Sequence, residues 1–81
     1  MTPDVLRDTI LQALRAIAPE IDAATLPDHA DMREALDLDS MDILRFASAL
    51  HEKLGVDIPE SDYSRIVKVA DCIEYLRARV V

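Results

Sequence analysis

Glycine, cysteine and aromatic residues are scarce in this chain, and each shortage excludes a class of structure. The 81 residues include one glycine, one cysteine, two tyrosines, one phenylalanine and no tryptophan. β-Sheet proteins use glycine in tight turns and aromatic residues on pleated faces, so this composition favours helices. The single Cys72 cannot form an intrachain disulfide, and no cysteine–histidine cluster has the spacing of zinc ligands. We therefore expect neither a disulfide nor a structural zinc ion in this protein. A chain without disulfides suits a reducing compartment.

Long apolar runs are absent as well. No run approaches the ~18 residues of a membrane span, and the first residues lack the basic and apolar segments of a secretory signal. We therefore expect a soluble, cytoplasmic protein. With 51% hydrophobic and 31% charged residues, the chain can bury a core and keep a polar surface. Domains of fewer than roughly 50 residues are seldom stable alone, so we expect residues 1–81 to form a single domain.

Negative charge is concentrated in one segment. The net charge is -7, and residues 19–42 contain a single basic residue, Arg33, against the acids Glu20, Asp22, Asp28, Asp31, Glu34, Asp37, Asp39 and Asp42. An acidic surface repels nucleic acid and attracts basic protein surfaces over long range. We expect protein partners with Lys/Arg patches and no nucleic acid, although solubility alone is the simpler explanation of the charge.

Helix signals mark both ends of the chain. Thr2 followed by Pro3 is a helix start, and Pro19 ends the helix because proline cannot continue it. The first helix is therefore predicted over residues 3–18, with the apolar stripe Leu6, Ile10, Leu14 and Ile17. A last helix is predicted from the stripe Val69, Ile73, Leu76 and Val80. Cys72 is expected to be a buried core residue of low reactivity on that helix.

Residues 19–39 are predicted to form a long loop. They contain two prolines and no sustained period, only the apolar anchors Ile21, Leu26, Met32, Leu36 and Leu38. Loops of this length in a compact domain are commonly functional.

A second helix is predicted over residues 40–54. Asp39 or Ser40 can cap its first turn, and Gly55 can end it by adopting a left-handed backbone. Its core stripe is Ile43, Phe46, Ala47, Leu50 and Leu54. Met41 and Leu44 form a second apolar edge outside that stripe, which can stay exposed for a partner.

A brief helical turn is predicted before the last helix. Ser61 or Asp62 can cap it, and it extends through Tyr63 and Ile66.

Ser40 lies where the acidic loop meets the first turn of the second helix. The free amides and positive dipole end of a helix start stabilise an anion, such as a phosphate on that hydroxyl. An Asp-Ser pair at a helix start is most often a simple cap, so the dipeptide alone identifies no site.

Four segments extend the pattern: LDLDSMD at 36–42, LGV at 54–56, IPE at 58–60 and IVKVAD at 66–71. Together they resemble the acyl carrier protein family over essentially the whole chain. The resemblance implies an all-α four-helix bundle with a short third helix and a long loop between helices one and two. It also implies a 4'-phosphopantetheine arm, transferred from coenzyme A to Ser40 by a phosphopantetheinyl transferase.

The same resemblance implies a freestanding, monomeric carrier and not an enzyme. The thiol of the arm holds acyl groups as thioesters, and the tether raises their local concentration at each partner's active site. The implied partners are acyl-activating, acyltransferase or synthase enzymes with basic docking patches.

Two departures from the family affect these expectations. Asp37 stands where a glycine is common, and Arg45, His51 and Lys53 interrupt a face that is typically acidic. They favour a specialised lipid or polyketide/secondary-metabolite pathway over generic fatty-acid synthesis.

Two further sets of residues are predicted. The partner-binding set is Asp37, Asp39, Met41, Asp42, Leu44, Arg45 and Glu52. The set around an acyl cavity is Ala47, Leu50, Ile58, Ile66, Ala70 and Ile73. The alanines of the second set can equally serve close helix packing, and both interpretations stand.

Two other hypotheses fail and two remain. A calcium loop starting at Asp37 fails on spacing, and His29 and His51 lack the oxyanion-loop motif of a hydrolase. A carrier-fold interaction module without a role in a catalytic pathway remains an alternative. An aminoacyl or peptidyl carrier is the other, although a Gly-Gly-x-Ser motif typical of that type is absent.

Overall fold

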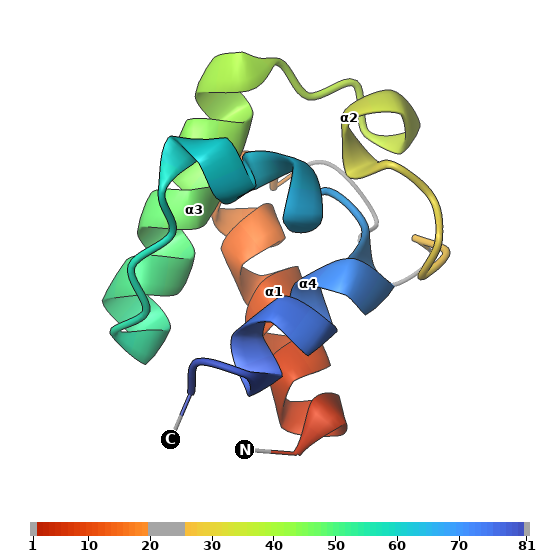
Figure 1. Ribbon diagram of the computed structural model, residues 1–81. Helices are drawn as coiled ribbons and strands as arrows, with labels where there is room; N and C mark the ends of the chain where they lie inside the picture. The colour runs from red at the N-terminus through yellow and green to blue at the C-terminus, as the bar shows by residue number, and fades with distance from the viewer. Residues whose placement is uncertain (1, 20–25, 81) are drawn as a thin grey trace.

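The computed structural model describes residues 2–19 and 26–80. These residues form α1 (Pro3–Ile17), α2 (Met32–Ala35), α3 (Ser40–Leu54), the 3-10 helix η2 (Glu60–Arg65) and α4 (Val69–Arg77), and they contain no strand (Figure 1). The predicted all-α class is therefore confirmed. No helix in this part of the chain is long and apolar enough to cross a membrane.

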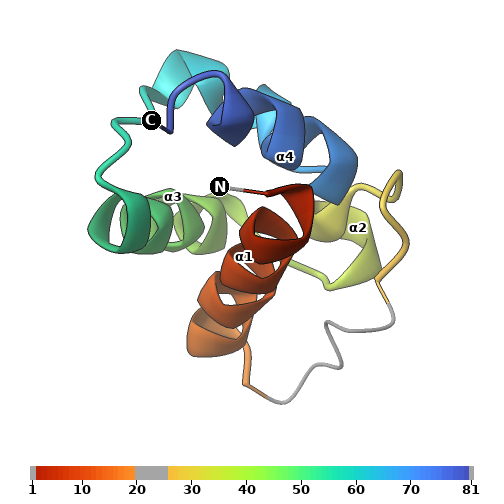
Figure 2. The same cartoon turned by 90° about the horizontal axis from the view of Figure 1, so that it is seen from below.

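The helices share one hydrophobic core. α1 contacts both α3 and α4, and η2 also contacts both of these helices (Figure 1). α2 lies at the end of the molecule where α3 begins, as both views show (Figures 1 and 2). The start of α3 is therefore surrounded by segments from distant parts of the sequence.

α1 follows its sequence signals closely. Thr2 caps the helix by accepting a hydrogen bond from the Val5 amide at 3.2 Å, and Pro3 opens the first turn. The buried face is Leu6, Ile10, Ala13 and Leu14. Ile17, the last residue of the predicted stripe, is half-buried.

The predicted long loop contains a helix that the sequence pattern did not indicate. α2 is a single turn capped by Asp31, whose side chain accepts from the Arg33 amide at 2.9 Å. The Met32 amide donates to the Val67 carbonyl at 2.8 Å, and the Ala70 amide donates to the Asp28 carbonyl at 3.0 Å. These bonds fix the segment against the entry to α4.

The predicted anchors of that segment pack as expected where the structure describes them. Leu26 and Met32 are buried, and Leu36 and Leu38 are half-buried against the core. Ile21 lies outside the described residues.

α3 has the predicted bounds, and Asp39 is its cap. The buried residues Ile43, Phe46, Ala47 and Leu50 belong to the predicted stripe, whereas Leu54 is half-buried. Gly55 ends the helix with φ of 69°, the left-handed conformation expected of a glycine there.

Two predictions about the last third of the chain are wrong. Neither Ser61 nor Asp62 caps the short helix, which begins after Pro59 without a side-chain cap. Asp62 instead accepts a hydrogen bond from the Tyr75 hydroxyl at 2.7 Å and so ties η2 to α4.

The buried face of α4 also differs from the prediction. It consists of Val69, Cys72, Tyr75 and Leu76, while Ile73 and Val80 are half-buried. Arg79 follows the helix. Its guanidinium carbon lies 3.6 Å from the centroid of the Tyr75 ring, and its guanidinium donates a hydrogen bond to the Tyr75 carbonyl. The prediction that Cys72 is buried is confirmed, and burial raises its pKa to about 12.

Candidate functional site

The start of α3 is fixed by a reciprocal pair of hydrogen bonds. The Asp42 amide donates to the Asp39 side chain at 2.9 Å, and the Asp39 amide donates to the Asp42 side chain at 3.2 Å. Ser40 lies between them as the first helical residue, and its side chain is exposed. The amides of Ser40 and Met41 have no hydrogen-bond partner within the described part of the chain. Two first-turn donors are thus free beside the Ser40 hydroxyl.

Asp37 explains how the chain turns into this helix. Its φ is 55°, in the left-handed region that non-glycine residues seldom occupy. The following Leu38 amide donates to the Arg33 carbonyl at 2.9 Å, which closes the turn after α2. Glycine adopts this backbone without strain, and aspartate tolerates it better than most residues. Asp37, which stands where the family commonly has a glycine, therefore forms a left-handed turn.

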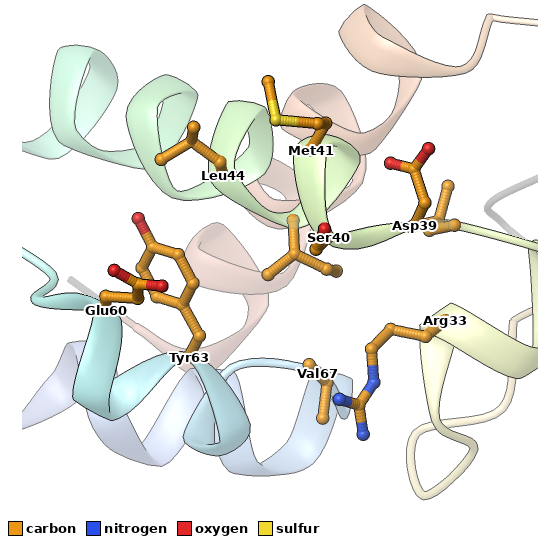
Figure 3. Close-up of a pocket in the computed structure, with 10 residues that line it drawn as sticks. Arg33, Asp39, Ser40, Met41, Leu44, Glu60, Tyr63 and Val67 are labelled. Atoms are coloured by element: carbon orange, nitrogen blue, oxygen red, sulfur yellow. The ribbon is translucent and has the colours of Figure 1, made fainter.

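A pocket of about 400 Å³ opens beside Ser40 (Figure 3). Its lining comes from α2, the turn before α3, the first two turns of α3, η2 and the segment before α4: Arg33, Leu38, Asp39, Ser40, Met41, Ile43, Leu44, Glu60, Tyr63 and Val67. Arg33 and Val67 lie across the pocket from Ser40 and Met41 (Figure 3). The lining combines apolar side chains with the charged side chains of Arg33, Asp39 and Glu60.

Arg33 is held in place by Asp31. Its Nε and one terminal nitrogen donate to the two oxygens of the Asp31 carboxylate at 3.0 and 2.7 Å. The hydrogen bonds from the Arg33 side chain lower the pKa of Asp31 below its ordinary value. This pair is therefore fully charged at neutral pH.

Comparison with known proteins decides the family. A model of the phosphopantetheine attachment site matches residues 4–76. The acyl carrier protein of Helicobacter pylori strain G27 is 36% identical over 66 residues, which covers 82% of this chain and 85% of that protein. The acyl carrier protein of Campylobacter jejuni subsp. doylei is 33% identical, covering 82% and 86%. The chain belongs to the acyl carrier protein family.

Membership establishes the cofactor and the general role. The cofactor of an acyl carrier protein is covalently attached 4'-phosphopantetheine, and these proteins are carriers and not catalysts. The family interacts with phosphopantetheinyl transferases and acyl-handling enzymes. The start of α3 fits such a group, because it offers an exposed hydroxyl, two free amides and an adjacent pocket.

The structure brings only some of the predicted partner-binding residues together. Asp39, Met41 and Leu44 line the pocket beside Ser40. Arg45 and Asp42 form an ion pair at 3.7 Å one turn along. Asp37 is exposed in the turn before α3, and Glu52 lies twelve residues beyond Ser40, roughly 18 Å along the helix axis.

None of the six predicted cavity residues lines the pocket beside Ser40. Ala47 and Ile58 line a second, smaller pocket of about 250 Å³, and Tyr63 lies between the two pockets as a lining residue of both. Leu50 and Ile66 are fully buried in the core, and Ala70 and Ile73 are half-buried. An acyl cavity formed by these six residues stays a prediction.

Six of the ten lining residues of the pocket beside Ser40 belong to none of the predicted sets. Leu38 and Ile43 lie within three residues of Ser40 in the chain, so their position close to Ser40 could be predicted from the helical register. Glu60, Tyr63 and Val67 reach the pocket from η2 and the segment before α4, and Arg33 reaches it from the unpredicted α2. No local signal identifies these four residues.

Proposed function

We propose that Ser40 is the attachment residue for 4'-phosphopantetheine and that the chain is a freestanding acyl carrier. One observation carries the assignment: the Ser40 side chain is exposed at the first residue of α3, beside a pocket and between two aspartates engaged with the backbone. The bound arm supplies a thiol that holds the acyl group as a thioester. The chain itself contributes attachment, orientation and recognition.

The residues around Ser40 suit an attached phosphodiester. The free amides of Ser40 and Met41 point from a helix start, where the dipole favours negative charge. The reciprocal bonds of Asp39 and Asp42 hold the first turn and satisfy one oxygen of each carboxylate. The serine hydroxyl is thus presented on a preformed turn.

We also propose that partner enzymes dock on the exposed edge of α3 next to Ser40. Met41 and Leu44 are 53% and 42% exposed, unusual for large apolar residues of a small domain. Asp37 and Asp39 add negative charge, and Arg45 adds an exposed positive charge. This surface fits a partner with an apolar contact, a basic patch and a carboxylate opposite Arg45.

The mixed charge of α3 is the basis for a proposal about the pathway. Arg45, His51 and Lys53 are all exposed on the helix that carries the docking edge. The basic patch of a partner that binds a uniformly acidic helix would be repelled by the basic side chains of α3. We therefore place the carrier in a specialised lipid or polyketide pathway. Identification of the thioester on protein isolated from its native host tests this placement.

Intact mass spectrometry tests the attachment itself. The protein is incubated with coenzyme A and a phosphopantetheinyl transferase, and we expect a mass gain of one arm. Ser40→Ala should abolish the gain, whereas Ser48→Ala, which removes another exposed hydroxyl of α3, should leave it intact. A lack of gain with several competent transferases would instead favour the unmodified interaction module.

A further inference from the structure

Arg33 is the only cationic side chain among the described residues that line the pocket beside Ser40. It is also the only lysine or arginine between Pro19 and Asp42 in the sequence. The side chain is 50% exposed and faces the pocket from the side opposite Ser40 (Figure 3). The most acidic segment of the chain thus places its single cation on the wall of the functional pocket.

Asp31 holds the Arg33 guanidinium in place, and some of the guanidinium N–H donors remain available to a ligand. Asp31 engages Nε and one terminal nitrogen, while an arginine carries five N–H donors in a rigid fork. Asp31 is itself fixed as the cap of α2, and α2 is tied to Val67 through the Met32 amide. Arg33 therefore holds its position without a ligand and can still bind an oxyanion.

Several negative charges surround Ser40. Asp39 and Glu60 line the same pocket, and Asp37 and Asp42 lie next to it in the sequence. An anion introduced at Ser40 is repelled by these carboxylates, and because Asp37, Asp39 and Glu60 are exposed, salt screens that repulsion. The Arg33 guanidinium on the opposite wall is already paired with Asp31, and its remaining N–H donors can bind a phosphate or carboxylate through two parallel bonds.

We propose that Arg33 is a positioning residue that binds an oxyanion of the arm attached to Ser40, and so draws the arm into the pocket. This inference rests on the proposed function. The oxyanion has two possible sources, the phosphodiester present in every modified form and the free carboxylate of a dicarboxylic acyl group. The chemistry of recognition is the same, and the experiment separates the sources.

The experiment compares four forms of the full chain: unmodified, modified with a free thiol, acetyl-loaded and malonyl-loaded. The Arg33 side-chain Nε–H signal is followed by ¹H–¹⁵N NMR, and the arm's phosphodiester by ³¹P NMR. Arg33→Gln is the test variant. Arg15→Gln is its charge-matched control, because Arg15 is exposed near the end of α1 and lines no described pocket.

Binding of the phosphodiester predicts that the Arg33 signal shifts on modification. It also predicts that Arg33→Gln, but not Arg15→Gln, moves the ³¹P resonance of the free-thiol form, and that both effects shrink between about 0.1 and 1 M salt. Binding of a carboxylate predicts an Arg33 shift only in the malonyl-loaded form. An Arg33 signal that is unchanged in all three modified forms overturns the inference.

Failure of the inference and failure of the proposed function are distinct. If mass spectrometry shows no arm on Ser40, the proposed function fails before any NMR comparison. If the arm is present and Arg33 does not respond, only the role of Arg33 is lost. Circular dichroism of Arg33→Gln verifies the fold, which we expect to persist because Asp31 caps α2 through the Arg33 backbone amide.

Discussion

Asp39 and Asp42 accept hydrogen bonds from each other's backbone amides across the first turn of α3. The two residues thereby satisfy two of the four amides that a helix start leaves free. The amides of Ser40 and Met41, which lie between them, have no partner among residues 2–19 and 26–80. The acidic residues around Ser40 thus have a structural role in addition to any recognition by partners.

Loss of the cap at Asp39 is expected to destabilise the protein. Asp39→Ala removes the acceptor for the Asp42 amide, so the free energy of unfolding should fall by about 1 kcal/mol. Asp39→Asn keeps an acceptor and should lose less. Urea denaturation followed by circular dichroism measures both. Equal losses for the two variants would show that the charge matters and the hydrogen bond does not.

The left-handed backbone at Asp37 predicts a contrast between two substitutions that remove the same carboxylate. Asp37→Gly should be more stable than Asp37→Ala by about 1–2 kcal/mol, because a β-carbon is unfavourable at φ of 55°. Thermal or urea denaturation of the two variants gives the difference directly. Indistinguishable stabilities would contradict the left-handed turn.

Burial of Cys72 predicts a loss of stability at alkaline pH. Its pKa is raised from 9.0 to about 12 in the folded chain, so above pH 9 the unfolded chain releases a proton that the folded chain keeps. This contribution to stability is complete below pH 9 and falls by about 1.4 kcal/mol per pH unit as the pH rises toward 12. Urea denaturation at several pH values measures the slope.

Cys72→Ala separates this effect from other alkaline titrations. The variant should be less stable at neutral pH, because it leaves space in the core, but its stability should fall less steeply above pH 9. The native thiol should also react with a thiol reagent far more slowly than the thiol of the urea-unfolded chain. Parallel pH slopes for the two proteins would refute the assignment.

The exposed apolar edge of α3 predicts a binding effect without a stability effect. Leu44→Ala should lower kcat/KM of a partner acyltransferase about fivefold or more, the effect of an interface residue worth about 1 kcal/mol. Val5→Ala is the matched control, since Val5 is 48% exposed on α1 and Leu44 is 42% exposed. Both variants should unfold within about 0.5 kcal/mol of the parent. A similar kinetic loss for both would remove the case for docking at Leu44.

Local physics in the sequence was sufficient for α1, α3 and the start of α4. Thr2 and Asp39 cap their own helices, Gly55 ends α3, and the apolar stripes have the helical period. Each of these signals acts over a few neighbouring residues, so it can be recognised in the sequence before the fold is known. The exposure of Ser40 follows from the same signals, because the residue after a cap opens the first turn.

Only the tertiary structure decided α2, the burial of Tyr75 on α4 and the pocket beside Ser40. α2 is too short to be stable alone and is held by burial of Met32 and its bond to Val67. Tyr75 is buried in the core, and Asp62 of η2 accepts a hydrogen bond from its hydroxyl. Contacts between residues far apart in sequence determine these features, and no periodicity within one segment encodes them.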